Sequence, residues 1–282
     1  MVAIDNSEDS FCWLSKLDKD LKKLAFNELK ILWTHGSTGL EGNTFSLGDT
    51  AFFLNEGLTI AGKSLREHNE IMGHAHGVSF LSELAEKKDI TEADLFILHK
   101  IIQTEKVYDS FAPVGKYKVE DNGCYVSGDG ERKFHFYPSH EKTPSLMGAW
   151  IKSFNHFLKN LNNCDVKTLL RQYAKFYISF VSIHPFADGN GRMSRLLSDL
   201  PLLVRGLIPV IIFKEDRRDY INLLSSYQKE SSEPTPSDLY TQNQQFEDFF
   251  VFIEESWGKS IEPIKPLFKQ QEKRNRNRQC SR

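Results

Sequence analysis

The sequence predicts a mainly α-helical protein that carries a single β-hairpin. Apolar residues recur at intervals of three and four through most of the chain, which is the spacing of amphipathic helices. A hairpin signal lies between Pro113 and Pro144, where β-prone residues flank an Asp-Asn-Gly turn. With 40% hydrophobic residues and 21 phenylalanines among 282 residues, the chain can fill a sizeable core.

The first predicted helix spans residues 13–33, where leucines recur at helical spacing and lysines occupy positions between them. It leads into the segment from Ser37 to Asn43. If that segment is helical, Ser37 and Glu41 lie one turn apart on the same face. Gly42 or Asn43 then makes a natural end for the helix, since glycine and asparagine tolerate left-handed backbone.

Three more helices are predicted before the hairpin, over residues 47–56, 63–86 and 91–102. The middle one contains His74 and His76. Side chains two positions apart on a helix point to different sides, so we expect surface or packing roles for them rather than a shared metal site.

The hairpin is predicted from two β-prone segments, Lys116–Val119 and Cys124–Val126, which flank Asp121-Asn122-Gly123. An Asn-Gly pair between such segments is the strongest short-range signal for a hairpin turn. A second aromatic, β-prone stretch follows over residues 133–138. We expect the hairpin to cover one edge of the helical core.

Five further helices follow; they are predicted over residues 146–161, 166–183, 193–205, a segment ending near 229, and 246–257. Pro201 should bend or end the third of them, because its ring removes a donor. The basic residues at the end of the chain show no apolar periodicity and predict a flexible tail. The expected organisation is therefore an N-terminal helical region (1–45), a main domain (46–260) and a tail (261–282).

Composition excludes several classes of function. A net charge of -2 provides no global field for nucleic acid or membrane surfaces. Four scattered cysteines without a CxxC pair argue against a zinc cluster and fit reduced thiols. The acidic N-terminus shows no signal peptide, and no apolar run approaches the roughly 20 residues of a membrane span. We therefore expect a cytoplasmic protein without membrane contact.

The most informative stretch is residues 184–195, between two apolar helical runs. Pro185 favours a break after the first run. Gly189 and Gly191 bracket Asn190, so the backbone can turn sharply and start a new helix there. The N-terminus of a helix has unpaired N–H groups and a positive dipole end, which makes it an anion site.

Four side chains of the same stretch carry reactive or charged groups: His184, Asp188, Arg192 and Arg195. Each has an ordinary interpretation, as a buried histidine, a turn residue or a solvated arginine. One short loop must accommodate all four, however, together with the anion site. A base, a carboxylate and two guanidinium groups beside an anion site indicate a phosphate-binding site that also catalyses a reaction.

The stretch matches, at every fixed position, the HPFx(D/E)GNGRxxR signature, and in this it resembles the Fic family. Typical members move AMP from ATP to a hydroxyl group of a protein. The resemblance implies a Fic fold, with a helical bundle core and a β-hairpin flap. It also implies that His184 is the general base, a role that suits imidazole, and that Asp188 holds Mg2+.

The resemblance further implies how ATP is bound. The backbone of residues 189–191 would form the anion hole, while Arg192 and Arg195 would clamp the outer phosphates. Tyr220 lies where family members often place an aromatic residue near the nucleotide. At Gln228 many relatives have an asparagine that touches the base, so the nucleotide preference does not transfer directly.

Residues 37–42 match a second family motif, (S/T)xxxE(G/N), which some Fic proteins carry before the catalytic domain. There the motif is inhibitory. The resemblance implies that Ser37 and Glu41 are regulatory, and that Glu41 pairs with Arg195 and blocks seating of the ATP γ-phosphate. Gly36 and Gly39 each weaken a helix by roughly 1 kcal/mol relative to alanine, which predicts a breakable latch.

Several functions fit these residues. The first is a protein adenylyltransferase, autoinhibited through Glu41, that acts on a Ser, Thr or Tyr hydroxyl of a target protein and on itself. In the second, Glu41 positions a water and the enzyme removes AMP from a modified protein. Kinase-like or phosphocholine transfer, known for variant members, is a third; the unmodified signature argues against the kinase-like variant. A non-catalytic module that binds nucleic acid or a partner is disfavoured by the intact signature.

Family members often bury a shared helical face, so a homodimer is expected.

Overall fold

The computed structural model describes residues 14–103, 113–128 and 131–280. In these ranges the fold is a helical bundle with one two-stranded hairpin, which confirms the predicted fold class. Each described helix is too short or too polar to cross a membrane. The helices are α1 Lys19–Leu40, α2 Leu47–Glu56, α3 Leu65–Lys87, α4 Glu92–Ile102, α5 Thr143–Lys159, α6 Val166–Ile183, α7 Asn190–Ser198, α8 Leu200–Val204, α9 Arg217–Glu230, α10 Gln244–Ile261 and α11 Lys265–Cys280.

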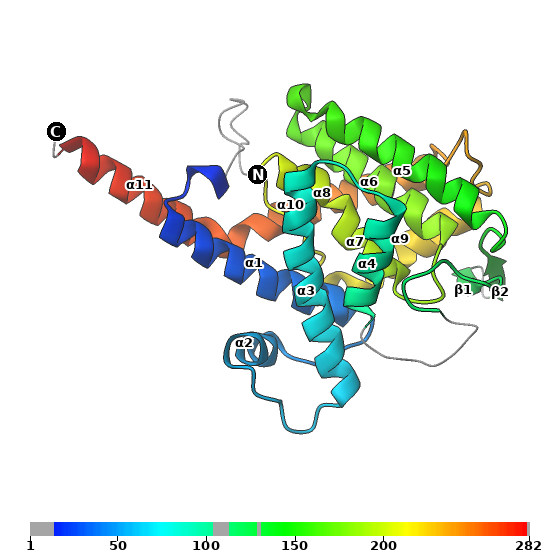
Figure 1. Ribbon diagram of the computed structural model, residues 1–282, viewed down its shortest axis with the longest axis horizontal. Helices are drawn as coiled ribbons and strands as arrows, with labels where there is room; N and C mark the ends of the chain where they lie inside the picture. The colour runs from blue at the N-terminus through cyan, green and yellow to red at the C-terminus, as the bar shows by residue number, and fades with distance from the viewer. Residues whose placement is uncertain (1–13, 104–112, 129–130, 281–282) are drawn as a thin grey trace.

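Helix α6 is the centre of the core, and α5, α7 and α10 pack against it (Figure 1). Its last turns, from Phe176 to Ile183, are buried on every side, as expected for a helix that others surround. Trp150 of α5 stacks on Phe154 and donates its indole N–H to Ser179 Oγ at 3.0 Å. Because α6 is held on all sides, its C-terminal end is a rigid place from which to present His184.

The hairpin differs from the prediction in its register. Strand β1 is Gly123–Gly128 and pairs antiparallel with β2, Glu131–Phe136. Asp121 and Asn122 therefore precede the hairpin and Gly123 begins its first strand, so these three residues do not form its turn. The predicted first strand, Lys116–Val119, lies on the signature loop, where the Lys118 N–H donates to the carbonyl of Pro185 at 2.9 Å. That tertiary hydrogen bond, which sequence spacing does not reveal, replaces pairing with β1.

The C-terminal residues also differ from the prediction of a flexible tail, because Lys265–Cys280 form helix α11. This helix lies beside the start of α1 at one end of the molecule and extends beyond it (Figure 1). The Gln271 side chain is buried and accepts the N–H of Asp18 at 2.7 Å. Arg274 donates to Asp20 at 2.7 Å. These contacts are polar, so hydrophobic periodicity did not signal the helix.

The predicted break at Pro201 occurs, and a buried carboxyl group sits beside it. Asp199 is fully buried between α7 and α8, and its Oδ1 accepts the Val210 N–H at 2.7 Å. Burial raises the pKa of Asp199 well above its usual value, although the hydrogen bond from Val210 opposes this. The carboxyl group is therefore neutral at pH values where it would ionise in the unfolded chain.

We expect this carboxyl group to make the protein less stable as pH rises. Its folded pKa exceeds its unfolded pKa, so between the two values the folded state binds the extra proton and stability falls with increasing pH. Over that range the free energy of unfolding falls by about 1.4 kcal/mol for each step of one in pH. Asp199→Asn should remove this pH dependence while keeping the acceptor for Val210. Urea unfolding of both proteins between pH 4 and pH 8 measures it; parallel curves would contradict the assignment.

Candidate active site

The signature stretch forms the turn between α6 and α7. His184 ends α6 in the left-handed backbone region, with φ of 52°. The Asn190 side chain folds the loop back on itself, because it accepts the Phe186 N–H at 2.9 Å and donates to the Phe186 carbonyl at 2.8 Å. Gly189, with φ of 77°, then starts α7. The local sequence therefore places His184 and a helix N-terminus on the same turn.

The His184 ring has a defined orientation. Its Nδ1 lies 3.2 Å from the Val181 carbonyl, which can only accept, so Nδ1 carries the proton and Nε2 is the basic nitrogen. The ring stacks on Tyr137 with centroids 3.9 Å apart and planes 4° apart. Burial lowers the pKa of His184 to about 4, and the nearby Lys118 charge also lowers it. The imidazole is therefore neutral and able to accept a proton at physiological pH.

The first turn of α7 has no room for side chains at its glycine. A Cβ on Gly191 would lie 2.6 Å from Glu41 Oε1 and 3.1 Å from Arg195 Nη1. The backbone N–H groups of this turn lack intrahelical partners and form the positive end of the helix dipole. The arrangement suits a phosphate group, provided that the Glu41 carboxylate moves away.

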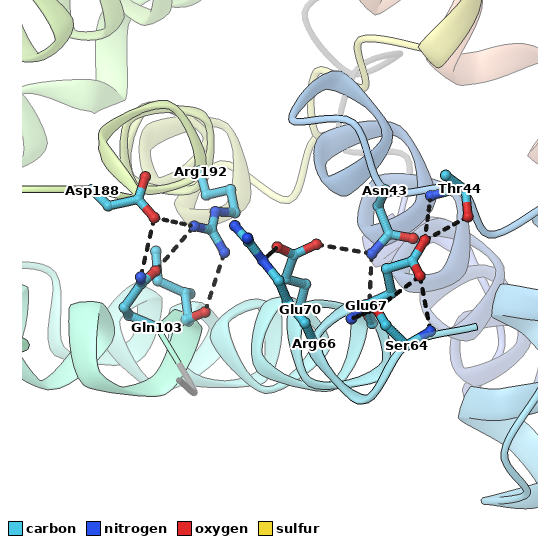
Figure 2. A network of polar contacts seen from close by, with 10 residues as sticks. Asn43, Thr44, Ser64, Arg66, Glu67, Glu70, Gln103, Asp188 and Arg192 are labelled. Atoms are coloured by element: carbon cyan, nitrogen blue, oxygen red, sulfur yellow. Dashed lines mark hydrogen bonds and ion pairs between the residues drawn. The ribbon is translucent and has the colours of Figure 1, made fainter. Parts of the chain in front are cut away.

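Asp188 and Arg192 lie on one side of this turn and are joined through Gln103 at the end of α4 (Figure 2). Arg192 is buried and donates to Gln103 Oε1 at 3.0 Å, while Gln103 donates to Asp188 Oδ2 at 3.1 Å. The Asp188 side chain is 63% exposed. Partial burial of Asp188 raises its pKa, but Arg192 and further donors outweigh this and hold the pKa below its usual value. An anionic, accessible carboxylate thus flanks the helix N-terminus.

Arg195 lies on the other side and is held by the end of α1. Its Nε donates to Ser37 Oγ at 2.9 Å, and its Nη2 lies 2.5 Å from Glu41 Oε1. Its Nη1 donates to Tyr220 Oη at 2.8 Å. Burial lowers the pKa of Arg195, yet Tyr220 and Glu41 raise it more, so its pKa lies above the usual value. The guanidinium group is 2% exposed and its donors are used by the protein itself.

Helix α1 continues through Ser37 to Leu40, and Glu41 caps it with right-handed helical backbone angles, so Ser37 and Glu41 lie on one face. A second network anchors this helix end (Figure 2). Asn43 donates to the Glu67 carbonyl at 3.1 Å and to Glu70 Oε2 at 3.0 Å. The Thr44 N–H donates to Glu67 Oε1 at 3.0 Å. The glutamate is therefore delivered to Arg195 by a helix end that α3 fixes in place.

Close packing against a neighbouring segment requires a glycine at position 36. A Cβ there would lie 2.6 Å from the backbone carbonyl of Ile212, which cannot move as a side chain can. We expect Gly36→Ala to lower the free energy of unfolding by roughly 1–3 kcal/mol, as overpacking does. Gly148→Ala is the control, since its Cβ meets nothing within 4 Å and should stabilise α5 by about 1 kcal/mol. Urea unfolding measures the stability of both variants. Equal gains in stability would contradict a steric clash between residue 36 and the Ile212 carbonyl.

Sequence motifs did not reveal several residues of the site. His99 donates from Nε2 to the Asp188 carbonyl at 3.1 Å, accepts the Gly115 N–H at 2.8 Å, and stacks on Phe186 with centroids 4.0 Å apart. Burial lowers the pKa of His99 to about 4, so it is neutral. His99 belongs to α4, and Gln103 is the residue directly after this helix. The sequence carries no signal that α4 meets the signature loop.

Tyr137 and Gln228 are far apart in the sequence but meet in the fold. Gln228 donates to Tyr137 Oη at 3.0 Å and accepts from Cys124 Sγ at 3.3 Å. Tyr220, expected beside a nucleotide, is buried against Arg195. The Gln228 amide thus supports the ring that stacks on His184.

The His74/His76 pair is divided between core and surface. His74 is fully buried, 3.2 Å from Thr34 Oγ1 through its Nδ1, whereas His76 is exposed. In the described part of the chain no cluster of three metal-ligating side chains occurs. This placement agrees with the expectation of surface and packing roles.

Known proteins are similar to this chain in the region that contains the signature stretch. The model of the family described as Fic/DOC matches residues 89–202. The chain is 30% identical over 226 residues to the Protein adenylyltransferase Fic of Drosophila virilis, and 33% identical over 226 residues to the protein of that name from Culex quinquefasciatus. These alignments cover 79% and 78% of this chain but only 43% and 41% of the two relatives. The chain thus spans about two fifths of their length.

Solved structures are similar over a larger share of their own length. A Fic domain containing signaling protein from Bacteroides thetaiotaomicron has a TM-score of 0.76 and 27% identity, covering 90% of this chain and 93% of that one. Fic-1 from C. elegans has a TM-score of 0.65 and 25% identity, covering 89% of this chain and 66% of that one. The similarity therefore extends over most of the described helices, well beyond residues 89–202.

Proposed function

Because residues 89–202 match the model of the Fic/DOC family, we propose that this chain is a member of that family and a protein adenylyltransferase, which transfers AMP from ATP to a hydroxyl group of a protein. One observation carries the proposal: a neutral His184, with Nε2 as its basic nitrogen, stands at the turn that begins α7. Relatives that are 30% and 33% identical bear the name of this activity, which supports it.

The reaction uses His184 as the general base. Its Nε2 accepts the proton of the target hydroxyl while the hydroxyl oxygen forms a bond to the α-phosphorus of ATP. The bond from the α-phosphorus to the bridging oxygen breaks, and pyrophosphate leaves with that electron pair. The N–H groups of α7 and the guanidinium of Arg192 stabilise the negative charge on the phosphates, which is the main source of rate in such transfers.

The residues also fit a magnesium ion. Asp188 is an anionic carboxylate that is 63% exposed, and its contacts with Gln103 and Arg192 both engage Oδ2. Hard cations such as Mg2+ take one or two carboxylates and complete their shell with phosphate oxygens and water. Asp188 would hold the ion, which when bound supplies neutralisation of phosphate charge. Gln103 keeps the carboxylate facing the α7 turn.

Glu41 is inhibitory in this proposal. Its carboxylate occupies Arg195 Nη2 and lies 2.6 Å from the position of a Cβ on Gly191, where a phosphate group would be bound. The carboxylate and a phosphate compete for the same guanidinium donors. The Glu41 side chain is 41% exposed, so it can leave without unfolding the core.

Removal of AMP from a modified protein is the second candidate. The exposed part of the Glu41 carboxylate favours it, since it can hold a water beside the α7 turn. Addition and removal pass through the same phosphorus and need the same His184 and Arg195. The homodimer expected from the resemblance stays a prediction.

The test is incubation of the purified chain with ATP labelled at the α-phosphate, alone and with a cell lysate. Covalent label on protein, lost when the label is moved to the γ-phosphate, is the result expected for transfer of AMP. Label that follows the γ-phosphate would instead identify a kinase. Release of AMP from a pre-labelled protein by the wild type would favour removal.

A further inference from the structure

Lys118 and Asn122 hold the carbonyl groups on both sides of His184. The backbone N–H of Lys118 donates to the carbonyl of residue 185 at 2.9 Å, and its Nζ lies 3.5 Å from the carbonyl of residue 183. Asn122 Nδ2 donates to the carbonyl of residue 186 at 3.1 Å. We propose that Lys118 and Asn122 are positioning residues that fix the backbone of His184 and thereby aim its imidazole at the target hydroxyl.

The backbone of His184 needs such support. Its φ of 52° is in the left-handed region, which residues other than glycine rarely adopt. Such a conformation persists only where the surrounding structure holds it, and it is often found at catalytic positions. The His184 N–H already donates to the Phe180 carbonyl at 2.9 Å. Lys118 and Asn122 hold the carbonyl side of the adjoining peptide units.

The Lys118 ammonium also joins the hairpin to this loop. It donates to Asn122 Oδ1 at 2.7 Å, just before β1, and to the Pro138 carbonyl at 2.7 Å, just after β2. Both ends of the hairpin are thus tied to the C-terminus of α6, where a positive charge is favoured by the helix dipole. Movement of the hairpin and movement of His184 are coupled through this one group.

The Lys118 ammonium is costly to bury. Lys118 is 4% exposed, and burial lowers its pKa to about 8, although Asp121 opposes the shift. Below that pH the protein carries a buried charge at a cost in free energy, because the folded pKa lies below the unfolded one. The hydrogen bonds to Asn122 and Pro138 offset part of this cost, and removal of the ammonium leaves their oxygens without this donor. A positioning role is therefore recognised by a loss of kcat that exceeds the loss of folded protein.

The inference rests on the proposed function, so its test combines activity with a measurement that does not need activity. In a Glu41→Gly background we compare Lys118→Met, Lys118→Arg and Asn122→Ala. Lys116→Met, which changes an exposed lysine two residues away, is the control. We expect kcat for transfer to fall about ten-fold or more in Lys118→Met and Asn122→Ala, since small misplacement of a catalytic group has effects of this size. The KM for ATP should stay within about two-fold of the parent, because the contacts of both residues are with the hairpin and the His184 backbone.

Amide hydrogen exchange gives the independent measurement. The amides of Lys118 and Tyr137 donate to the carbonyls of Pro185 and Asn122. Peptides that contain them should exchange faster in Lys118→Met and Asn122→Ala, while those of α5 stay unchanged. Lys118→Arg should recover part of kcat, and Lys118→Met should remain folded at the assay temperature, so that its loss of kcat exceeds any loss of folded protein.

Three results would overturn the assignment. One is exchange and kcat equal to those of Lys116→Met. Another is a fall in kcat matched by equal losses of Tm and ATP binding, which indicates a structural role. The third is unchanged exchange in both variants. If the Glu41→Gly parent transfers no AMP at all, the proposed function fails, and the exchange measurement decides the positioning role by itself.

Discussion

The His184→Ala variant is expected to transfer AMP roughly 10²–10⁴-fold more slowly than its parent, which is the usual contribution of a general base. The imidazole is neutral, and its Nδ1 is bound to Val181, so Nε2 is the nitrogen that the variant loses. Single-turnover incorporation of AMP from α-labelled ATP in a Glu41→Gly background measures the loss. Binding of ATP should be unchanged, because in the proposed reaction His184 acts on the target hydroxyl and not on the phosphates.

His140→Ala is the matched control for this experiment. His140 is a partly exposed histidine whose Nδ1 lies 2.9 Å from Asp121 Oδ1. Its loss should leave the rate within about two-fold of the parent. If both alanine variants retain the parent's rate, His184 is not the base.

The pH dependence of the same reaction follows from the environment of His184. Burial lowers its pKa to about 4, Lys118 also lowers it, and Asp188 and Glu41 oppose them. A base with a lowered pKa stays unprotonated, so the rate should be constant as pH falls from about 8 to 5 and should decline only as pH approaches 4. A decline centred near 6.5, the pKa of a free histidine, would contradict the buried setting.

The Glu41→Gly variant is expected to transfer AMP roughly 10–100-fold faster than the wild type, because a hydrogen bond between charged groups contributes about 1.5–3 kcal/mol. Removing the carboxylate frees Arg195 Nη2 and clears the space above Gly191. Incorporation of label at an ATP concentration well below the KM of the wild type measures the gain. The ATP affinity should rise as well, since the phosphate no longer competes with a carboxylate.

Two further variants separate charge from shape. Glu41→Gln keeps an oxygen that can accept from Arg195 but removes the negative charge, so its rate should lie between those of the wild type and Glu41→Gly. Ser37→Ala removes the acceptor 2.9 Å from Arg195 Nε and leaves the carboxylate, so its gain should be smaller. A Glu41→Gly protein no faster than the wild type would refute inhibition by Glu41. Loss of AMP release in that variant would support the removal reaction.

Much of the fold was predictable because its helices bury apolar faces with regular spacing. The predicted ranges 47–56 and 166–183 coincide with α2 and α6. Helix α11 was missed, since among its described side chains only Leu267 and Phe268 near its start pack on the core and the rest is held by polar contacts such as that of Gln271 with Asp18, which leave no apolar period. The predicted strand pairing of the hairpin was wrong, because the Asn122 side chain donates to the Phe186 carbonyl and Asn122 does not form the turn.

The amino-acid sequence by itself determined the components of the site. One continuous stretch supplies His184, Asp188 and Arg195, and a second motif supplies Glu41, because helical spacing and glycine positions are local properties. Only the tertiary structure decided which distant residues hold them: Gln103 on Asp188, Tyr137 on His184, and Lys118 on the loop between α6 and α7. These contacts join residues far apart in the chain, and their partners are set by how the helices pack, which no local pattern encodes.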